Sequence, residues 1–98
     1  MIVVSQTIRT NTPSIQTGAT AISSNPERQG WSIQNVGQNP LFVNLGGTAS
    51  SSVFHFVLKG GSADSDGLGA IVSQTSGTVY TGTITVAGTS PKYVVLEQ

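Results

Sequence analysis

Large apolar residues alternate with small polar ones along much of the chain, and this period of two is the pattern of strands that bury one face. The alternation is clearest in residues 31–34 and again in residues 41–45. Between them, residues 37–40 (Gly-Gln-Asn-Pro) favour a chain reversal, because Gly tolerates positive φ, Asn bonds its own backbone and Pro fixes φ. The pattern predicts a β-hairpin within residues 28–46, with Pro40 at the start of its second strand, where a missing N–H is tolerated.

The same alternation predicts further short strands, separated by segments rich in Gly, Ser, Asn and Pro. These strands are expected at residues 19–23, 53–58, 68–72, 78–86 and 92–97, with a candidate first strand in residues 1–8. No helical period and no repeat at solenoid spacing occurs. Seven to eight short strands predict an all-β domain, a small antiparallel β-sandwich or barrel. Its core is expected to contain Trp31, Ile33, Leu41, Val43, Phe54, Phe56, Ile84 and Val95.

The composition agrees with a folded β domain. Only 8% of the 98 residues are charged, where about 25% is usual, and the formal net charge is zero. Disordered chains usually carry high net charge and few β-branched residues, whereas this chain has many Val, Ile and Thr residues. We expect residues 1–18 to form an extended N-terminal arm and residues 19–98 to form a single β domain.

The charges and the absence of cysteine limit the classes of partner. The basic residues Arg9, Arg28, Lys59 and Lys92 are scattered, which argues against binding of nucleic acid through its phosphates. No stretch approaches the roughly 20 apolar residues of a membrane helix, and residues 1–4 are too short for the core of a signal peptide. Without cysteine there are no disulfides or thiolate metal sites, so we expect synthesis and folding in a cytosol. Few charges give little protection against self-association, which favours a subunit of an assembly.

Two polar groups are similar to known sites without completing them. Residues 64–67 (Asp-Ser-Asp-Gly) are similar to the start of a calcium loop, but its fifth position would be Leu68 and its twelfth, normally a bidentate Glu, would be Thr75. A surface turn is therefore favoured. His55 is the single histidine, and neither a second histidine nor a cysteine can complete a zinc site. No G-x-S-x-G elbow accompanies it, so a solvent-facing or interface role is favoured over catalysis.

The glycine-rich and aromatic residues give weaker indications. Residues 60–62 and 67–69 lack the spacing and the following helix of phosphate-binding loops. Trp31, Tyr80 and Tyr93 could form a platform for a sugar or a base, but their phase favours packing in the core. We therefore expect no catalytic, cofactor-binding or metal-ligating residues, and we expect the protein not to be an enzyme.

The order of motifs from residue 25 onward resembles that of small β-structured virion proteins of tailed bacteriophages. The matching stretches are residues 25–46, which contain the motifs Asn-Pro, Ile-Gln-Asn and Asn-Pro-Leu, residues 54–61, which end in Leu-Lys-Gly-Gly, residues 66–69 and residues 80–97. They cover about three-quarters of the chain and consist of turn and strand residues rather than a catalytic signature. Proteins of this size in that group often serve as capsid decoration (cement) proteins, and others sit on tails or head fibres.

The resemblance implies a non-enzymatic structural protein that decorates and stabilises a bacteriophage capsid. The implied partners are the major capsid protein and further copies of this chain, with a trimer among the expected homo-oligomers, and neither nucleic acid nor membrane. The protein would be made in the host cytoplasm and reside in the virion. The alternative is a tail or head-fibre recognition module that binds a host-surface glycan or protein. A hydrolase that uses His55 is the third hypothesis.

The expected partner-binding residues are the apolar residues of the arm, Ile2, Val3, Val4 and Ile8. A polar stretch that contains Pro13 separates them from the β domain. A terminus usually stays disordered unless something ties it down, and an apolar one is a ready strand for another sheet edge. We therefore predict that residues 1–9 pair with a neighbouring subunit or with the capsid. The alternative is that they complete the sheet of their own domain.

Overall fold

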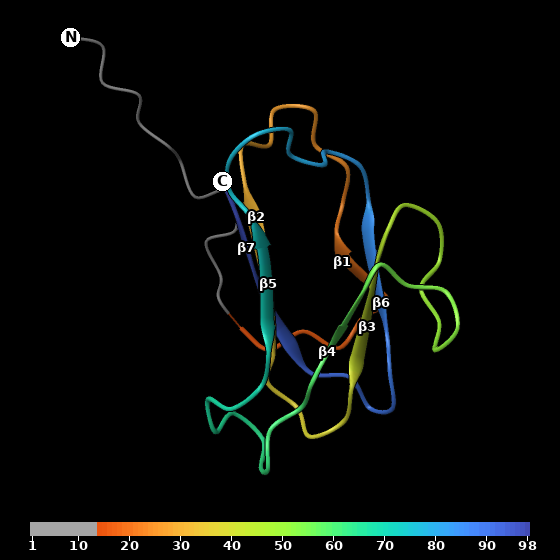
Figure 1. Cartoon of the computed structure of the whole chain (residues 1–98), viewed down its shortest axis with the longest axis vertical. Helices are drawn as coiled ribbons and strands as arrows, with labels where there is room; N and C mark the ends of the chain where they lie inside the picture. The colour runs from red at the N-terminus through yellow and green to blue at the C-terminus, as the bar shows by residue number, and fades with distance from the viewer. Residues whose placement is uncertain (1–13) are drawn as a thin grey trace, which may run out of the picture.

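The computed structural model describes residues 14–98, which fold into two antiparallel β-sheets that face each other (Figure 1). The four-stranded sheet has the order β1-β6-β3-β4, and the three-stranded sheet has the order β5-β2-β7. The strands are β1 (Thr20–Ile22), β2 (Trp31–Asn35), β3 (Leu41–Leu45), β4 (Phe56–Leu58), β5 (Ile71–Gln74), β6 (Ile84–Ala87) and β7 (Tyr93–Glu97). The described residues contain these seven strands and no helix. The predicted all-β architecture is therefore confirmed, as a sandwich rather than a closed barrel.

The core lies between the two sheets, where alternate residues of the strands point inward. Trp31 and Ile33 of β2 and Leu41 and Val43 of β3 are at most 1% exposed. Each such side chain contributes about 1.5–3 kcal/mol by leaving water. The buried core consists of Ile22, Trp31, Ile33, Leu41, Val43, Leu58, Ile84, Val86 and Tyr93. Of the predicted core residues, Trp31, Ile33, Leu41, Val43 and Ile84 are confirmed, and Val95 lies partly buried against them.

The predicted hairpin is wrong, although both of its strands exist. β2 pairs with β5 and β7, whereas β3 pairs with β4 and β6, so residues 36–40 connect one sheet to the other. Both strands face the same core from opposite sides, at the roughly 10 Å spacing of packed sheets. Asn35 stabilises this crossing, since its Oδ1 accepts the N–H of Gly37 at 2.9 Å. Its Nδ2 donates to the carbonyls of Asn39 and Leu58, at 2.8 and 2.9 Å.

Phe54 and Phe56, which were predicted to be core residues, are exposed instead. The ladder is irregular at His55, whose N–H donates to the carbonyl of Val43 at 2.7 Å. The ring Nδ1 of His55 accepts the N–H of Leu45 at 3.0 Å, so a side chain takes the place of a backbone acceptor. β4 begins only after this point, which leaves Phe54 outside the strand and 41% exposed. Phe56 is in register with Val43, but it lies on an edge strand and is 36% exposed.

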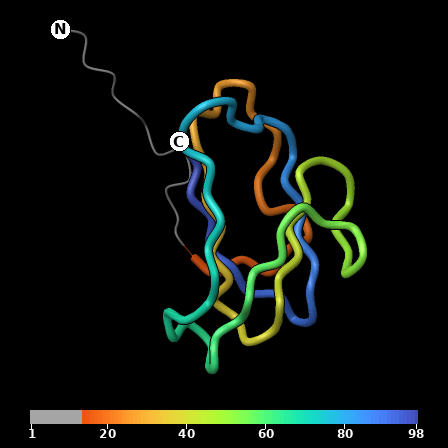
Figure 2. The backbone as a smooth tube through the Cα atoms, in the orientation of Figure 1, coloured from red at the N-terminus to blue at the C-terminus, as the bar shows by residue number. Residues whose placement is uncertain are grey.

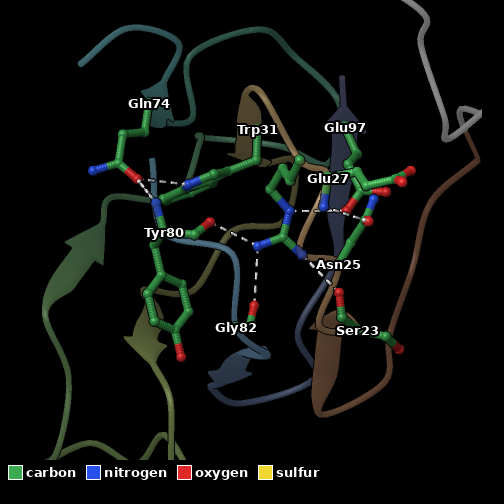
Figure 3. A network of polar contacts seen from close by, with 9 residues as sticks. Ser23, Asn25, Glu27, Trp31, Gln74, Tyr80, Gly82 and Glu97 are labelled. Carbon is green, nitrogen blue, oxygen red and sulfur yellow. Dashed lines mark hydrogen bonds and ion pairs between the residues drawn. The ribbon is translucent and has the colours of Figure 1, made fainter. Parts of the chain in front are cut away.

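The strand predicted over residues 78–86 is wrong in its first half, because β6 begins only at Ile84. In the irregular part, the Arg28 guanidinium donates through Nη1 to the carbonyls of Tyr80 and Gly82, at 2.8 and 3.0 Å (Figure 3). Gly82 lies so close to the Tyr80 ring that a Cβ would fall 2.3 Å from its hydroxyl. The bonds from the distant Arg28 side chain direct the carbonyls of Tyr80 and Gly82 away from a sheet ladder.

The other predicted strands are found with small shifts. Those expected at residues 19–23 and 92–97 correspond to β1 and β7, and the one expected at residues 68–72 lies slightly later, as β5. Residues 14–22 cross from one sheet to the other (Figure 2). Gln16 and Tyr93 of β7 exchange two backbone hydrogen bonds, at 2.7 and 3.1 Å, before the chain reaches β1. The last part of the predicted arm, after residue 13, is therefore bound to the domain through Gln16.

Candidate interaction surface

An apolar patch lies on the outer face of the four-stranded sheet, beside its edge. Phe42 alternates with the buried Leu41 and Val43, so its side chain points away from the core. Val57 is its cross-strand neighbour on β4. The rings of Phe42 and Phe54 lie 5.1 Å apart, centroid to centroid, and Val57 is 51% exposed. We call Phe42, Phe54 and Val57 the apolar patch.

A hollow in the surface adjoins the apolar patch. Its volume is about 350 Å³, and it is lined by Asn39, Pro40, Phe42, Ser51, Gly88 and Thr89. The lining places amide, hydroxyl and backbone groups next to an aromatic ring and contains no charged side chain. This hollow can therefore receive an uncharged polar group from a partner that covers the patch.

β4 also has a free edge. Among the strands of residues 14–98 it pairs with β3 alone. Other segments contact its C-terminal end, where Asn35 Nδ2 donates to the Leu58 carbonyl and the Ala70 N–H donates to the Lys59 carbonyl, each at 2.9 Å. The edge is open at Phe56 and Val57, where no strand of the described domain lies along its other side. Natural edge strands are usually protected by charged residues, by Pro or by bulges. Residues 53–57 contain no Lys, Arg, Asp or Glu, and Lys59 follows the strand. Phe56 is 36% exposed although its register partner Val43 is completely buried, so an added strand would cover the part of Phe56 that faces solvent.

The outer face of the three-stranded sheet is uncharged as well, but it is more polar. Ser32 and Gln34 occupy its central strand and point outward between the apolar residues of β5 and β7. Ile71 and Leu96 are exposed there, beside a hollow of about 250 Å³. Because polar side chains interrupt this face, the apolar patch is the better candidate for a surface that a protein covers.

The two aspartates of the predicted surface turn shape their loop. The carboxylate of Asp66 accepts the N–H groups of Leu68, Ala63 and Ser62, each at 2.9 Å. These bonds hold the pKa of Asp66 below its usual range, with the bond from Leu68 contributing most. Asp64 forms an ion pair with Lys92, which lowers the pKa of that carboxyl group in the same way. These are the contacts expected of the surface turn.

The described part of the chain contains no group of three or more His, Asp or Glu side chains that could hold a metal.

The aromatic residues considered as a sugar or base platform are largely internal. Trp31 is completely buried and Tyr93 is 1% exposed, so the core interpretation is confirmed for both. Trp31 Nε1 donates to Gln74 Oε1 at 3.0 Å, and the N–H of Tyr80 donates to the same oxygen at 2.7 Å (Figure 3). Tyr93 Oη donates to the Gly18 carbonyl at 2.6 Å, and burial raises the pKa of this phenol. Tyr80 is half-buried against the core.

The predicted partner-binding residues Ile2, Val3, Val4 and Ile8 lie outside the residues that the structure describes. His55, expected to face solvent or an interface, is exposed.

The alternation of residues 53–58 does not reveal the apolar patch, because the ladder is irregular at His55. One signal for it was readable in the sequence: Phe42 is out of phase with Leu41 and Val43, so a large aromatic residue had to point outward.

No helix in residues 14–98 is long and apolar enough to cross a membrane. Comparisons with protein-family models, with curated proteins and with solved structures found no match to this chain. The functional interpretation therefore rests on the surface described above and on the resemblance in the order of the sequence motifs.

Proposed function

We propose that this chain is a non-enzymatic structural protein of a bacteriophage virion, which binds the outside of the capsid through the apolar patch and stabilises the shell. The observation that carries the proposal is the patch itself: Phe42, Phe54 and Val57 lie together on one outer sheet face without a covering element in the described domain. Phe54 and Val57 are exposed and Phe42 between them is half-buried, and contiguous apolar surface of this kind marks sites that bind other proteins.

The chemistry of the patch fits a protein partner. Aromatic side chains supply much of the binding energy at protein interfaces, because each covers a large area and loses little conformational freedom. The adjoining hollow adds Asn39, Ser51 and Thr89 as polar groups at the rim. An apolar centre with a polar, uncharged rim is the common anatomy of such an interface. The partner in this proposal is the major capsid protein.

Stabilisation of the shell follows from binding alone. A protein that binds the assembled capsid but not its dissociated subunits stabilises the assembly by mass action, and the effect grows with the free concentration of that protein.

Because the chain has zero net charge and the patch contains no charged residue, long-range electrostatics contribute little to association. We therefore expect the affinity for capsids to change little with salt concentration.

The proposal is tested by cosedimentation of the purified protein with capsids of the phage whose genome encodes it, prepared without the protein. We expect the wild type to bind and to raise the temperature at which the shells rupture. Val57→Lys places a charge in the patch and should weaken binding at least tenfold. Leu96→Lys, on the exposed face of the other sheet, is the matched control and should bind as the wild type does.

Absence of binding by the wild type would overturn the proposal, as would equal binding by Val57→Lys. Circular dichroism and thermal unfolding of each variant establish that a loss of binding does not come from a loss of folding.

The hollow beside Phe42 favours a second candidate function, recognition of a host-surface glycan by a tail or head-fibre protein. Sugars bind where an aromatic face meets amide and hydroxyl groups, and Asn39, Ser51 and Thr89 provide such groups here. In this case a panel of immobilised glycans should retain the wild type, and Asn39→Ala should reduce retention at least tenfold while capsids do not bind. Retention by no glycan would remove this candidate.

A further inference from the structure

We propose that residues 1–9 of a neighbouring copy of this chain add as a β-strand to the free edge of β4, so that copies assemble by exchanging their N-terminal arms. This assembly does not require capsid binding, because its acceptor is the edge of β4 rather than the apolar patch on the sheet face. It can therefore be tested on the purified protein alone.

The acceptor is the edge on which the described domain leaves Phe56 uncovered. Phe56 and Val43 are opposite each other in the β3–β4 ladder, yet the first is 36% exposed and the second is completely buried. The difference arises because β3 has strands on both sides and β4 has one neighbour only. A strand added to β4 would bury Phe56 further and would pair the backbone groups of β4 that neither β3 nor Asn35 contacts.

The sequence of residues 1–9 matches this edge in composition. Ile2, Val3, Val4, Thr7 and Ile8 are β-branched, and Arg9 is the only charged side chain of the segment. Residues of this type have the highest preference for strands, and Pro13 lies beyond the segment, so no proline within it removes a ladder hydrogen bond. The acceptor segment 53–57 is likewise free of Lys, Arg, Asp and Glu, so the pairing places no charges opposite each other.

The position at which the described chain begins favours exchange between copies. Gln16 is fixed to Tyr93 on β7, and the following segment leads to β1, so the chain enters the domain at the side where β1 and β7 lie. β4 is the far edge of the four-stranded sheet, three strand spacings from β1, which is about 14 Å. An arm that reached β4 of its own domain would also have to pass around the side chains of a sheet face. Seven peptide units separate Arg9 from Gln16 and span at most about 25 Å, so only a fully extended connection could make this detour. This favours the β4 edge of a neighbouring copy as the acceptor.

Exchange of this kind is a heterologous contact, in which the arm of one copy meets the edge of the next. Such contacts close into a ring or continue as a filament, depending on the rotation between copies. A closed ring, such as a trimer, uses every arm and every β4 edge. Removal of residues 1–9 should then release monomers whose β domain is still folded.

The test uses the absence of cysteine from the wild-type sequence. Single cysteines are introduced in the arm (Ile2→Cys, Val4→Cys or Ile8→Cys), and Val57→Cys is introduced beside the edge in a separate preparation. Arm and edge variants are mixed, dissociated with denaturant, refolded together and oxidised. We expect disulfide-linked dimers between different copies, formed at least tenfold faster than with Thr20→Cys, which lies on β1 at the other edge of the same sheet.

The molar mass of the wild type and of a variant without residues 1–9 is measured by sedimentation, together with circular dichroism. We expect an oligomer for the wild type and a folded monomer for the truncated chain. A monomeric wild type, or an oligomer that persists after truncation, would overturn the proposal. If the truncated chain fails to fold, a variant that carries both an arm cysteine and Val57→Cys in the same chain provides the test. Disulfides that form only within single chains would show that residues 1–9 complete their own domain. That result would overturn the proposal.

Discussion

The Nε of Arg28 lies 2.9 Å from the Oε2 of Glu97, in an ion pair whose arginine side chain is completely buried. The same guanidinium donates to the carbonyls of Tyr80, Gly82 and Ser23 (Figure 3). Arg28 therefore ties the end of β7 to the irregular segment before β6 and to the end of β1. In residues 14–98 no buried side-chain nitrogen or oxygen lacks a hydrogen-bond partner, as a buried charge requires.

Arg28→Met should strongly destabilise the protein. The substitution keeps much of the apolar volume but leaves the Glu97 carboxylate and three carbonyls without their donor, and breaking a buried pair in this way costs about 3–5 kcal/mol. The free energy of unfolding in urea measures the effect. Lys92→Ala is the matched control, because it breaks the Lys92–Asp64 pair at the exposed surface and should lower the free energy of unfolding far less. Equal costs for the two variants would show that the Arg28 network does not stabilise the fold.

Truncation of Leu41 and of Phe54 should have very different effects on stability. Leu41 is 1% exposed in the core, so Leu41→Ala should lower the free energy of unfolding by about 2–5 kcal/mol. Phe54 is 41% exposed and packs against Phe42 on the outer face, so Phe54→Ala should cost about 1 kcal/mol or less. Chemical denaturation of both variants provides the comparison. A cost of several kcal/mol for Phe54→Ala would place its ring in the core, contrary to the structure.

Gly69→Ala should destabilise the protein, whereas Gly18→Ala should not. A Cβ at position 69 would fall 1.8 Å from the carbonyl oxygen of Asn35, so the loop before β5 would have to move away from β2. Overpacking of this kind costs about 1–3 kcal/mol or more. A Cβ at Gly18 meets no atom within 4 Å. Thermal unfolding of the two alanine variants measures the difference, and a similar melting temperature for both would contradict the close packing of this loop.

Asp66 should make the stability of the loop depend on pH in the acid range. Its pKa is lowered in the folded protein from the ordinary 3.8 by the bonds from Leu68, Ala63 and Ser62. The unfolded chain therefore binds a proton at a higher pH than the folded one. The contribution of Asp66 is present above about pH 4 and is lost as the pH falls through the lowered pKa.

Asp66→Asn should consequently show a smaller decline in melting temperature between about pH 5 and pH 2. Since the pKa of Asp64 is lowered too, a variant with both substitutions should be flatter still. Identical pH profiles for the wild type and Asp66→Asn would show that these backbone bonds do not form in solution.

Local alternation identifies most of the strands and, in β2 and β3, the side chains that they bury. The alternation at residues 31–34 and 41–45 is a local property of the chain, because successive side chains of a strand point to opposite faces whatever its neighbours are. Trp31, Ile33, Leu41 and Val43 were therefore identified as core residues without knowledge of the topology. The composition likewise indicates a surface with few charges.

The pairing of the strands and the position of the edges depend on the three-dimensional arrangement of the chain. β2 and β3 look like a hairpin in sequence, but they do not pair with each other, and each has other strands on both sides. Phe56 has the phase of a core residue and is exposed because no strand covers the outer side of β4. The carbonyls of Tyr80 and Gly82 leave the predicted strand because Arg28, more than fifty residues earlier, binds them. Alternation reports which face of a strand is buried; the partner of each strand depends on contacts between residues far apart in the sequence, which a local pattern does not contain.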